Sequence, residues 1–419
     1  MGVTFMRRFL GILGPGLITG AADDDPSGIS TYSVAGASFG YAPLWTAVVS
    51  FPLMVAVQLM CARLGMVTGR GLACAIRLHY PRWILVGACA LLVVANVINI
   101  GADLGGMAET SQLVTRISAF FWTPFYAGLI IALLFLTSYR LVARLFKWLT
   151  LALFAYVGTA FLAHADWRAV LEATVFPRFH WSREFLALLV AILGTTISPY
   201  LFFWQAAQEV EEERAKGRSR EQRERRGATD RALENSRTDV LAGMFFSNLI
   251  MYFIILTTAA TLHAHGRTSI ATAREAAEAL RPLAGDGAYW LFTIGLVGTG
   301  MLGIPVLAGS SAYAVAEAAG WKGSLGRQPH AARGFYWVIG IALGLGWTLN
   351  WVHFNAVKML FWSAVINGLL APPLILLVLL LTSSRSVMGE RVNPPLLQGL
   401  GWMALTVMVA AALGMVFTS

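Results

Sequence analysis

Three consecutive aspartates stand inside an apolar stretch near the start of the chain. They are Asp23, Asp24 and Asp25 in the segment GAADDDPSGIS, residues 20–30, and Pro26 follows them directly. Because proline breaks a helix, the carbonyls of the preceding turn are left without partners beside Asp25. A carboxylate with backbone carbonyls is a typical ligand set for a hard cation. We therefore expect Asp25 to bind a cation. Asp23 and Asp24 should face an aqueous vestibule, since successive helical residues point about 100° apart.

A second break of the same kind lies halfway along the chain. In GTTISPY, residues 194–200, Pro199 follows Ser198 inside another apolar stretch. A further carboxylate, Asp103, lies within NIGADLGGMAE. Carboxylates inside apolar spans are costly and mark ion or proton pathways by default. We expect Asp103 to act away from the ion, as a proton acceptor or as a charge along the exit path.

The elements that position these residues are long apolar segments. Of 419 residues, 57% are hydrophobic and 13% are charged, about half the charged fraction of an average soluble chain. A helix needs about 20 apolar residues to cross a bilayer. Eleven segments meet this length, at about 10–33, 43–65, 83–106, 121–138, 147–163, 185–208, 240–262, 287–316, 334–352, 358–381 and 396–417. We expect an all-α polytopic membrane protein, with residues 1–419 forming one domain.

The two breaks occupy matching positions in two blocks of five spans. The first block covers about 10–163 and the second about 185–381, with 396–417 as an extra helix. Because each block has an odd number of spans, the second must enter the membrane inverted. Broken helices at matching positions of inverted halves point to the midplane site of a secondary transporter.

Basic residues predict the orientation in the membrane. With a cytoplasmic N-terminus, 23 of the 31 Lys and Arg residues fall on the inner side. The positive-inside rule therefore places the N-terminus in the cytoplasm and the C-terminus outside. We expect the membrane to be a bacterial inner (plasma) membrane. The net charge of +9 then reflects topology, and the expected partner is the lipid bilayer rather than a nucleic acid.

One strongly polar segment, 209–239, separates the sixth and seventh spans. We expect it to be a solvated helical connector on the cytoplasmic side, and contact of its Arg-rich middle with anionic lipid is left open. The three cysteines, Cys61, Cys74 and Cys89, are not clustered. They fit neither a disulfide framework nor a metal motif, and we expect small buried hydrophobic residues.

The motifs resemble those of the Nramp family of divalent metal transporters. GPGLITGAADDDPSG resembles the first span of that family, whose Asp-Pro falls on Asp25 and Pro26. ILGTTISPY resembles its sixth span, and Asp103 falls on its third-span proton-pathway aspartate. The resemblance covers about residues 8–380. It implies a LeuT-type fold and a metal site at Asp25.

The chain departs from the family pattern at several site positions. The family's ligating Asn is Gly28 here, and its ligating Met is Ser198. Its two sixth-span His are Tyr200 and Gln205, and its third-span Glu is Gly106. Its tenth-span Gln is Ala364, with Asn367 nearby. Only Asp25 remains of the implied side-chain ligands, together with carbonyls near Ala22 and Thr195. Loss of the thioether removes a soft ligand, and small Gly28 and Ser198 leave room for a partly hydrated ion such as Mg²⁺. This pattern is similar to the magnesium-transporting branch of the family.

We therefore expect a secondary transporter that moves divalent metal cations by alternating access and favours hard ions such as Mg²⁺ or Mn²⁺. Proton coupling is left open, and no cofactor is expected. The expected metal residues are Asp25, Ser198, Ala22, Thr195 and Gly28, and the expected permeation or proton pathway residues are Asp103, Asp24, Asp23, Gln205, Tyr200 and Asn367.

Two other transporter functions and one enzyme class offer alternatives to this expectation. A transition-metal (Mn/Fe) proton symporter and an amino-acid or organic-cation transporter on the same fold both remain open. In the amino-acid case, Asp25 would repel a substrate carboxylate held at a half-helix N-terminus. An intramembrane aspartyl protease would use two aspartates, but it gives the paired breaks no role.

Overall fold

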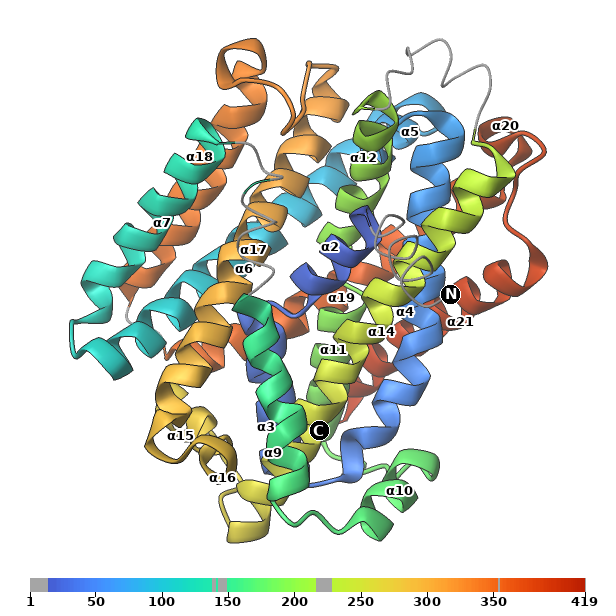
Figure 1. The fold of residues 1–419 in the computed structure, drawn as a ribbon. Helices are drawn as coiled ribbons and strands as arrows, with labels where there is room; N and C mark the ends of the chain where they lie inside the picture. Colours follow the sequence, from blue (N-terminus) through green and yellow to red (C-terminus); the bar gives the residue numbers. More distant parts are fainter. Residues whose placement is uncertain (1–13, 138–140, 142–148, 216–227, 353–354, 419) are drawn as a thin grey trace, which may run out of the picture.

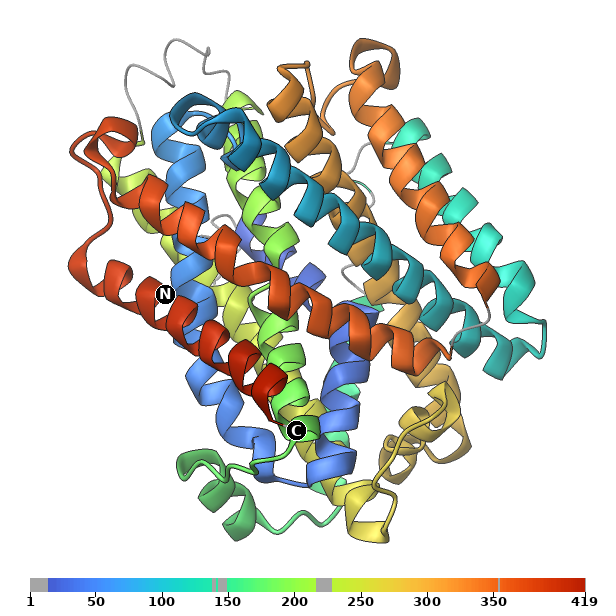
Figure 2. The same ribbon diagram turned by 180° about the vertical axis from the view of Figure 1, so that it is seen from behind.

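The structure is a computed structural model that describes residues 14–137, 141, 149–215, 228–352 and 355–418. Within these ranges every regular element is a helix (Figures 1 and 2). The α-helices are α2 (Pro15–Asp23), α3 (Pro26–Phe39), α4 (Trp45–Thr68), α5 (Leu72–His79), α6 (Arg82–Thr115), α7 (Ala119–Leu136), α9 (Phe154–Leu162), α10 (Trp167–Val175), α11 (Arg183–Thr196), α12 (Pro199–Ala215), α14 (Asp230–Thr261), α15 (Ala273–Glu278), α16 (Arg281–Ala284), α17 (Ala288–Ala319), α18 (Arg333–Leu349), α19 (Ala356–Ser383), α20 (Arg385–Met388) and α21 (Pro395–Phe417). Short 3-10 turns are η1 (Ala42–Leu44), η2 (Leu149–Leu153), η3 (His263–His265), η4 (Gly285–Gly287), η5 (Pro329–Ala331) and η6 (Asn350–Val352).

Eight helical segments in the described ranges are long and apolar enough to cross a bilayer. They coincide with expected spans two to four, six to eight, ten and eleven. The other three expected spans are shorter. The first is divided at the aspartates, the fifth contains the apolar helix Leu151–Leu162, and the ninth is α18 with 17 residues. Seventeen residues are at the lower end of what can span a bilayer.

The two expected helix breaks are confirmed. The first span is interrupted between α2 and α3, and the sixth between α11 and α12. Each second half begins at a proline, Pro26 or Pro199, which suits the first helical position because that position needs no N–H partner. Asp25, directly before Pro26, is extended with ψ 171°, as expected for a residue that precedes proline.

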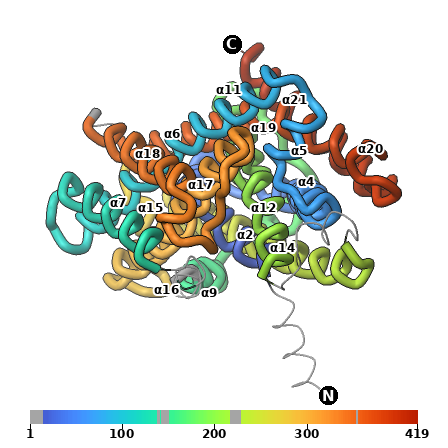
Figure 3. Tube along the Cα trace, turned by 90° about the horizontal axis from the view of Figure 1, so that it is seen from above, coloured from blue at the N-terminus to red at the C-terminus, as the bar shows by residue number. Residues whose placement is uncertain are grey.

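Small residues hold each first half-helix against a long helix. Gly16 and Gly20 of α2 lie so close to α14 that a Cβ on Gly20 would overlap the backbone of Gly243. Gly194 of α11 meets Gly368 of α19 in the same way. Small residues allow this close backbone approach, which is how membrane helices gain packing energy. In the view from above, α2 lies centrally between α12, α14 and α17 (Figure 3).

The outer surface of the bundle is strongly apolar. Many large hydrophobic side chains on the outer helices and loops are exposed. Examples are Leu136, which is 83% exposed, and Trp181 and Phe417, which are each 79% exposed. A soluble protein would not display so many, whereas side chains that face lipid are expected to be apolar. The apolar surface and the lengths of the apolar helices therefore both indicate a protein that spans a membrane.

Loops expected on one side of the membrane meet at one face of the molecule. The helices α5 and α20 lie at the face shown uppermost in Figure 1. Near α20, Arg391 pairs with Asp230 at 2.8 Å, and the N–H of Cys74 in α5 donates to the Glu317 carboxylate at 3.0 Å. At the opposite face, the Ala273 N–H donates to Glu109 at 3.0 Å. The expected inner and outer loops thus separate into two groups.

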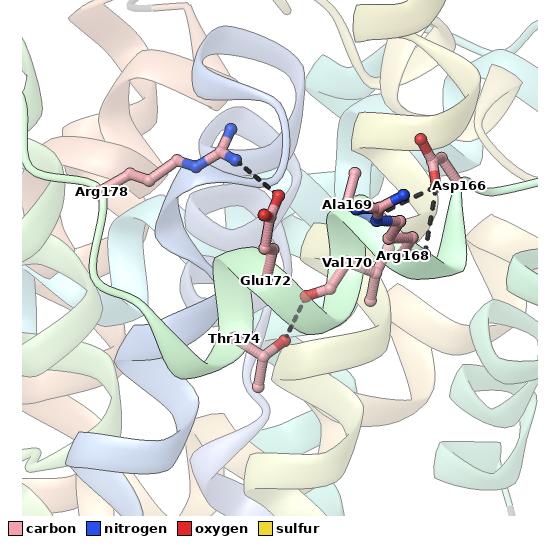
Figure 4. Close-up of polar contacts among 7 residues, drawn as sticks. All are labelled: Asp166, Arg168, Ala169, Val170, Glu172, Thr174 and Arg178. Atoms are coloured by element: carbon pink, nitrogen blue, oxygen red, sulfur yellow. Dashed lines mark hydrogen bonds and ion pairs between the residues drawn. The ribbon is translucent and has the colours of Figure 1, made fainter.

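The short helix α10 lies at the face shown lowermost in Figure 1, and Figure 4 shows its polar contacts. Asp166 is its N-cap, and one carboxylate oxygen accepts the N–H groups of Arg168 at 3.1 Å and Ala169 at 3.2 Å. Such a cap satisfies donors that have no partner in the first helical turn. Arg178 pairs with Glu172 at 3.2 Å just beyond the helix.

The described parts of the polar segment 209–239 are largely helical, and most of their residues are exposed or half-buried. The first residues continue α12 to Ala215, and the last residues begin α14 at Asp230. Three carboxylates depart from the solvated pattern, because Glu209, Glu213 and Asp239 are buried against neighbouring helices. The charged pattern gave no sign of their burial, which depends on contacts with other helices. The Arg-rich middle, 216–227, lies outside the described residues, and so does its expected contact with lipid.

The cysteines are free thiols, as expected. Cys61 and Cys89 are buried among apolar side chains, whereas Cys74 is partly exposed near the end of α17.

Candidate functional site

Asp25 lies at the gap between α2 and α3 and is the N-cap of α3. Its side chain is 2% exposed. Oδ1 accepts hydrogen bonds from the Ser27 hydroxyl at 2.6 Å and the Gly28 N–H at 2.9 Å. Oδ2 accepts one from the Asn99 amide of α6 at 2.9 Å. A buried carboxylate is thus held by donors from two helices.

Asp23 and Asp24 do not face a vestibule, so that expectation is wrong for the conformation described. They are 0% and 5% exposed, and the Ser247 hydroxyl of α14 lies 2.7 Å from Asp23 Oδ2 and 3.2 Å from Asp24 Oδ1. A cavity of about 830 Å³ opens between α3, α11, α19 and α21, but none of the three aspartates lines it. The tight contact of α2 with α14 covers these carboxylates, and local sequence does not report that contact.

The carbonyl of Ala22 has a partner from the second broken helix. The Tyr200 hydroxyl of α12 donates to the Ala22 carbonyl at 2.9 Å and lies 3.5 Å from Asp25 Oδ2. Tyr200 therefore joins the two breaks, which are 178 positions apart in the sequence. The carbonyl oxygen has a second lone pair, so an ion can bind it beside this hydroxyl or in its place.

Ser198 and Thr195 lie at the second break and are buried. The Ser198 hydroxyl turns back onto α11, where it donates to the carbonyls of Gly194 at 3.0 Å and Thr195 at 2.8 Å. In this conformation the hydroxyl covers the Thr195 carbonyl instead of pointing at Asp25. For the Ser198 hydroxyl and the Thr195 carbonyl both to face an ion at Asp25, as the sequence predicts, the hydroxyl has to turn away from α11.

Gly28 and two glycines of α17 allow the backbone to close around the site. A Cβ at position 28 would lie 3.3 Å from the Tyr32 ring and 3.4 Å from the Asp23 carbonyl. A Cβ on Gly303 would lie 3.1 Å from Cβ of Asp25, and one on Gly300 would overlap Met107 of α6. A larger side chain at these positions would have to displace its neighbours, so glycine allows α17 to pack closely against the break.

Asp103 lies on α6, one helical turn beyond Asn99. It is fully buried, and its carboxylate oxygens have no hydrogen-bond partner in the described part of the chain. Asn367 on α19 is 2% exposed and its Oδ1 has none either. Both remain predicted pathway residues.

Gln205 connects three helices. It accepts a hydrogen bond from Thr19 of α2 at 2.5 Å and donates to Glu209 at 3.0 Å, and Ser236 of α14 also donates to Glu209 at 2.8 Å. In this conformation Gln205 is therefore part of a closed polar network. Its predicted place on a pathway remains a prediction.

Sequence reasoning missed Asn99, Ser27 and Ser247, the donors to the three aspartates. One signal was present for Asn99. It precedes Asp103 by four residues, so both lie on one face of a helix. Ser247 carries no comparable signal, because only the packing of α14 on α2 brings it to the aspartates.

The charges at the site are one-sided. Among the described residues, Asp23, Asp24 and Asp25 form no ion pair with Lys, Arg or His. In the same part of the chain, no three His, Cys, Asp or Glu side chains are arranged to hold a metal ion together. A cation at Asp25 would therefore need backbone or amide oxygens as its remaining ligands.

Almost the whole chain resembles one family of known proteins. Residues 16–418 match the model of the Nramp family, described as natural resistance-associated macrophage protein-like. The divalent metal cation transporter MntH of Aeromonas hydrophila is 27% identical over 420 residues, covering 96% of this chain and 95% of that protein. Alignments with curated relatives cover from 64% to 95% of the relatives' lengths.

Two solved structures share the architecture. The manganese transporter of Eremococcus coleocola superposes with a TM-score of 0.78 at 20% identity, over 98% of this chain and 86% of that one. Mhp1, a nucleobase-cation-symport-1 family transporter, gives 0.58 at 13% identity, over 95% and 92%. These likenesses confirm the expected all-α membrane protein with a LeuT-type fold.

Proposed function

The chain belongs to the Nramp family of divalent metal cation transporters, and from this premise we propose that it carries Mn²⁺ or a similar hard divalent ion through a site at Asp25. The observation that supports this site best is a buried, hydrogen-bonded carboxylate at a helix break, with no cationic side chain among the described residues paired to it. A dication there would compensate charge that otherwise remains buried.

The identity of the ion follows from the available donor atoms. Asp25, the Ala22 and Thr195 carbonyls and the Ser198 hydroxyl offer oxygen only, which suits Mg²⁺ and Mn²⁺ alike. In the sequence, the small residues Gly28 and Ser198 favoured Mg²⁺. The relatives are a divalent metal cation transporter and a manganese transporter, which favours Mn²⁺. We therefore propose Mn²⁺ as the main substrate and Mg²⁺ as a competitor.

We propose that binding is accompanied by two local rearrangements. The Tyr200 hydroxyl leaves the Ala22 carbonyl, and the Ser198 hydroxyl leaves the Thr195 carbonyl, so that both carbonyls turn to the ion. Both movements occur at the ends of half-helices. Alternating access would then move the half-helices against the long helices that hold them.

The test is ion uptake into proteoliposomes containing the purified protein. Asp25→Asn keeps the shape of the side chain but removes its charge, so saturable Mn²⁺ uptake should fall at least tenfold. Asp286→Asn is the matched control, because its side chain is 98% exposed on the outer loops, and uptake should not change. Size-exclusion profiles and thermal unfolding should be the same for both variants. Wild-type uptake by Asp25→Asn would refute the site.

We further propose that transport is proton-coupled and that Asp103 takes part. Its support is a buried carboxyl without partners among the described residues, one turn from Asn99, inside a span where carboxylates mark proton or ion pathways. A pH dye inside the proteoliposomes should report acidification during Mn²⁺ entry in wild type. Asp103→Asn should keep Mn²⁺ entry but lose the acidification. Mn²⁺ entry without acidification in wild type would rule out coupling.

A further inference from the structure

We propose that Asn99 of α6 is a side-chain ligand of the transported ion and binds it through Oδ1, beside Asp25. The inference rests on the proposed function at Asp25, because it adds a ligand to that same site. It also fills a gap in the donor set, since position 28 carries no side chain.

The amide of Asn99 already lies at the carboxylate. Its Nδ2 donates to Asp25 Oδ2 at 2.9 Å, and the residue is fully buried. The other end of the amide, Oδ1, has no hydrogen-bond partner among the described residues. A buried acceptor without a partner costs about 1–3 kcal/mol, so it is rare in a native fold unless something else binds it.

Ion binding would satisfy both groups at once. When a cation binds Asp25 Oδ2, that oxygen no longer needs the amide donor. A half-turn of the amide then exchanges Nδ2 for Oδ1, because the two ends of an amide have nearly the same shape. Oδ1 would point to the same place with the right charge for a cation. An amide oxygen is an ordinary ligand for Ca²⁺, Mg²⁺ and Mn²⁺.

The backbone of α6 is held firmly at this point. Asn96, one turn earlier, donates to the Leu307 carbonyl at 3.0 Å and to the hydroxyls of Ser310 and Ser311 at 2.9 Å on α17. These contacts fix α6 against α17 and keep Asn99 within reach of Asp25, and a ligand held on packed helices is well placed for binding. Asn96 is itself buried, and its Oδ1 has no partner in the described part of the chain, but its amide donates to α17 and not to an aspartate.

The alternative role is a purely structural one, in which Asn99 only orients Asp25. The two roles differ in what a soft atom at position 99 would do. A thiolate that reaches the ion favours Cd²⁺ over Mn²⁺, because sulfur is a soft ligand. A lost orienting contact weakens the binding of both ions to the same extent.

The experiment measures Mn²⁺ and Cd²⁺ binding to purified protein at fixed pH by titration calorimetry, without transport. Asn99→Cys should raise the Cd²⁺-to-Mn²⁺ affinity ratio at least tenfold and produce a Cd–thiolate absorbance band in the ultraviolet. Asn96→Cys is the matched control on the same helix and should leave the ratio unchanged. Asn99→Leu should weaken both ions about tenfold and gives the size of the loss when no ligand atom is present. Asn99→Met repeats the soft-ligand comparison with a thioether if the cysteine variant folds poorly.

An unchanged ratio in Asn99→Cys, with the same loss as Asn99→Leu, would overturn the proposal and leave Asn99 an orienting residue. So would an equal rise of the ratio in Asn96→Cys. The proposed function is tested by a different variant, Asp25→Asn. It would be refuted if Asp25→Asn kept wild-type Mn²⁺ binding and uptake, whatever the Asn99 variants show.

Discussion

Individual side chains at the two breaks are held by one another in the conformation described. Asp25 accepts from Ser27, Gly28 and Asn99, while the Tyr200 hydroxyl occupies the Ala22 carbonyl. Each of these oxygen atoms therefore has a protein partner with which a cation would compete. The free energy of ion binding is then the free energy gained by coordination minus the free energy of the hydrogen bonds that the ion displaces. A single substitution can change either of these two free energies.

Tyr200→Phe should strengthen Mn²⁺ binding. The substitution removes the hydroxyl that occupies the Ala22 carbonyl, so the ion no longer competes with a hydrogen bond of about 1 kcal/mol. The expected gain is roughly fivefold in affinity, measured by Mn²⁺ titration of purified protein. Tyr156→Phe, a change in another buried tyrosine away from the breaks, should have no effect. Weaker binding in Tyr200→Phe would mean that the hydroxyl itself contacts the ion.

Ser198→Met should change the selectivity of uptake. It adds a soft sulfur at the second break and frees the Thr195 carbonyl that the hydroxyl now covers. Competition assays should show Cd²⁺ gaining roughly tenfold against Mg²⁺, about 1.4 kcal/mol. Ser198→Ala, which frees the carbonyl without adding sulfur, is the control. Adding Gly28→Asn would complicate the result, because a side chain there presses on Tyr32 and the Asp23 carbonyl. No difference between the Met and Ala variants would place Ser198 away from the ion.

At the scale of helices, α2 is held at both ends. Its C-terminal end meets Tyr200, and its N-terminal turn is capped by Asp239 of α14. The carboxylate accepts the N–H groups of Gly14 at 2.8 Å, Gly16 at 2.6 Å and Leu17 at 3.1 Å. A negative group at a helix N-terminus is favourable both as a cap and toward the helix dipole. Movement of α2 away from α14 therefore requires this cap to break.

Asp239→Asn should loosen α2. The amide loses the charge and one of the two acceptor oxygens, so the closed position of α2 should lose about 1–2 kcal/mol. Hydrogen–deuterium exchange of a peptide that covers residues 14–25 should then rise roughly five- to thirtyfold. Asp166→Asn removes a comparable cap from α10 and should affect only that helix (Figure 4). Unchanged exchange in α2 would show that glycine packing alone holds it.

At the scale of the whole molecule, the described loops that the sequence places on the inner side meet at one face, and the described outer loops meet at the other. This grouping agrees with the pattern of basic residues along the sequence. If one of these loops is shown to be cytoplasmic, the other loops at the same face must be cytoplasmic too. We predict that the face with Arg391 and Asp230 is cytoplasmic, because most Lys and Arg lie in its loops.

Labelling with a membrane-impermeant maleimide tests this orientation. In a background with the three native cysteines replaced by alanine, Asp286→Cys should be labelled in intact cells. Asp230→Cys should be labelled only after the membrane is permeabilised. Both side chains are more than 90% exposed, at 98% and 93%, so access is not limited by burial. The reverse labelling pattern would show that the orientation is the opposite of the predicted one. Labelling of both cysteines in intact cells would show that the two faces do not lie on opposite sides of the membrane.

Local sequence determined the features that depend on neighbouring residues. Apolar runs of helical length predict spans, a proline ends a helix wherever it occurs, and a charge inside an apolar run marks a functional position. The two breaks, the placement of carboxylates beside the first break and most spans could therefore be predicted. The LeuT-type fold followed from the resemblance that these motifs carry.

Tertiary structure alone decided which groups meet. Asn99 reaches Asp25 across 74 positions, Tyr200 reaches Ala22 across 178, and Asp239 caps Gly14 across 225. It also buried Asp23 and Asp24, together with three carboxylates of the segment 209–239 (Glu209, Glu213 and Asp239), where the sequence predicted contact with water. These contacts depend on how closely distant helices approach, which glycines such as Gly243 and Gly303 allow. Periodicity and local breaks specify each helix, but they carry no information about which face of another helix it will meet.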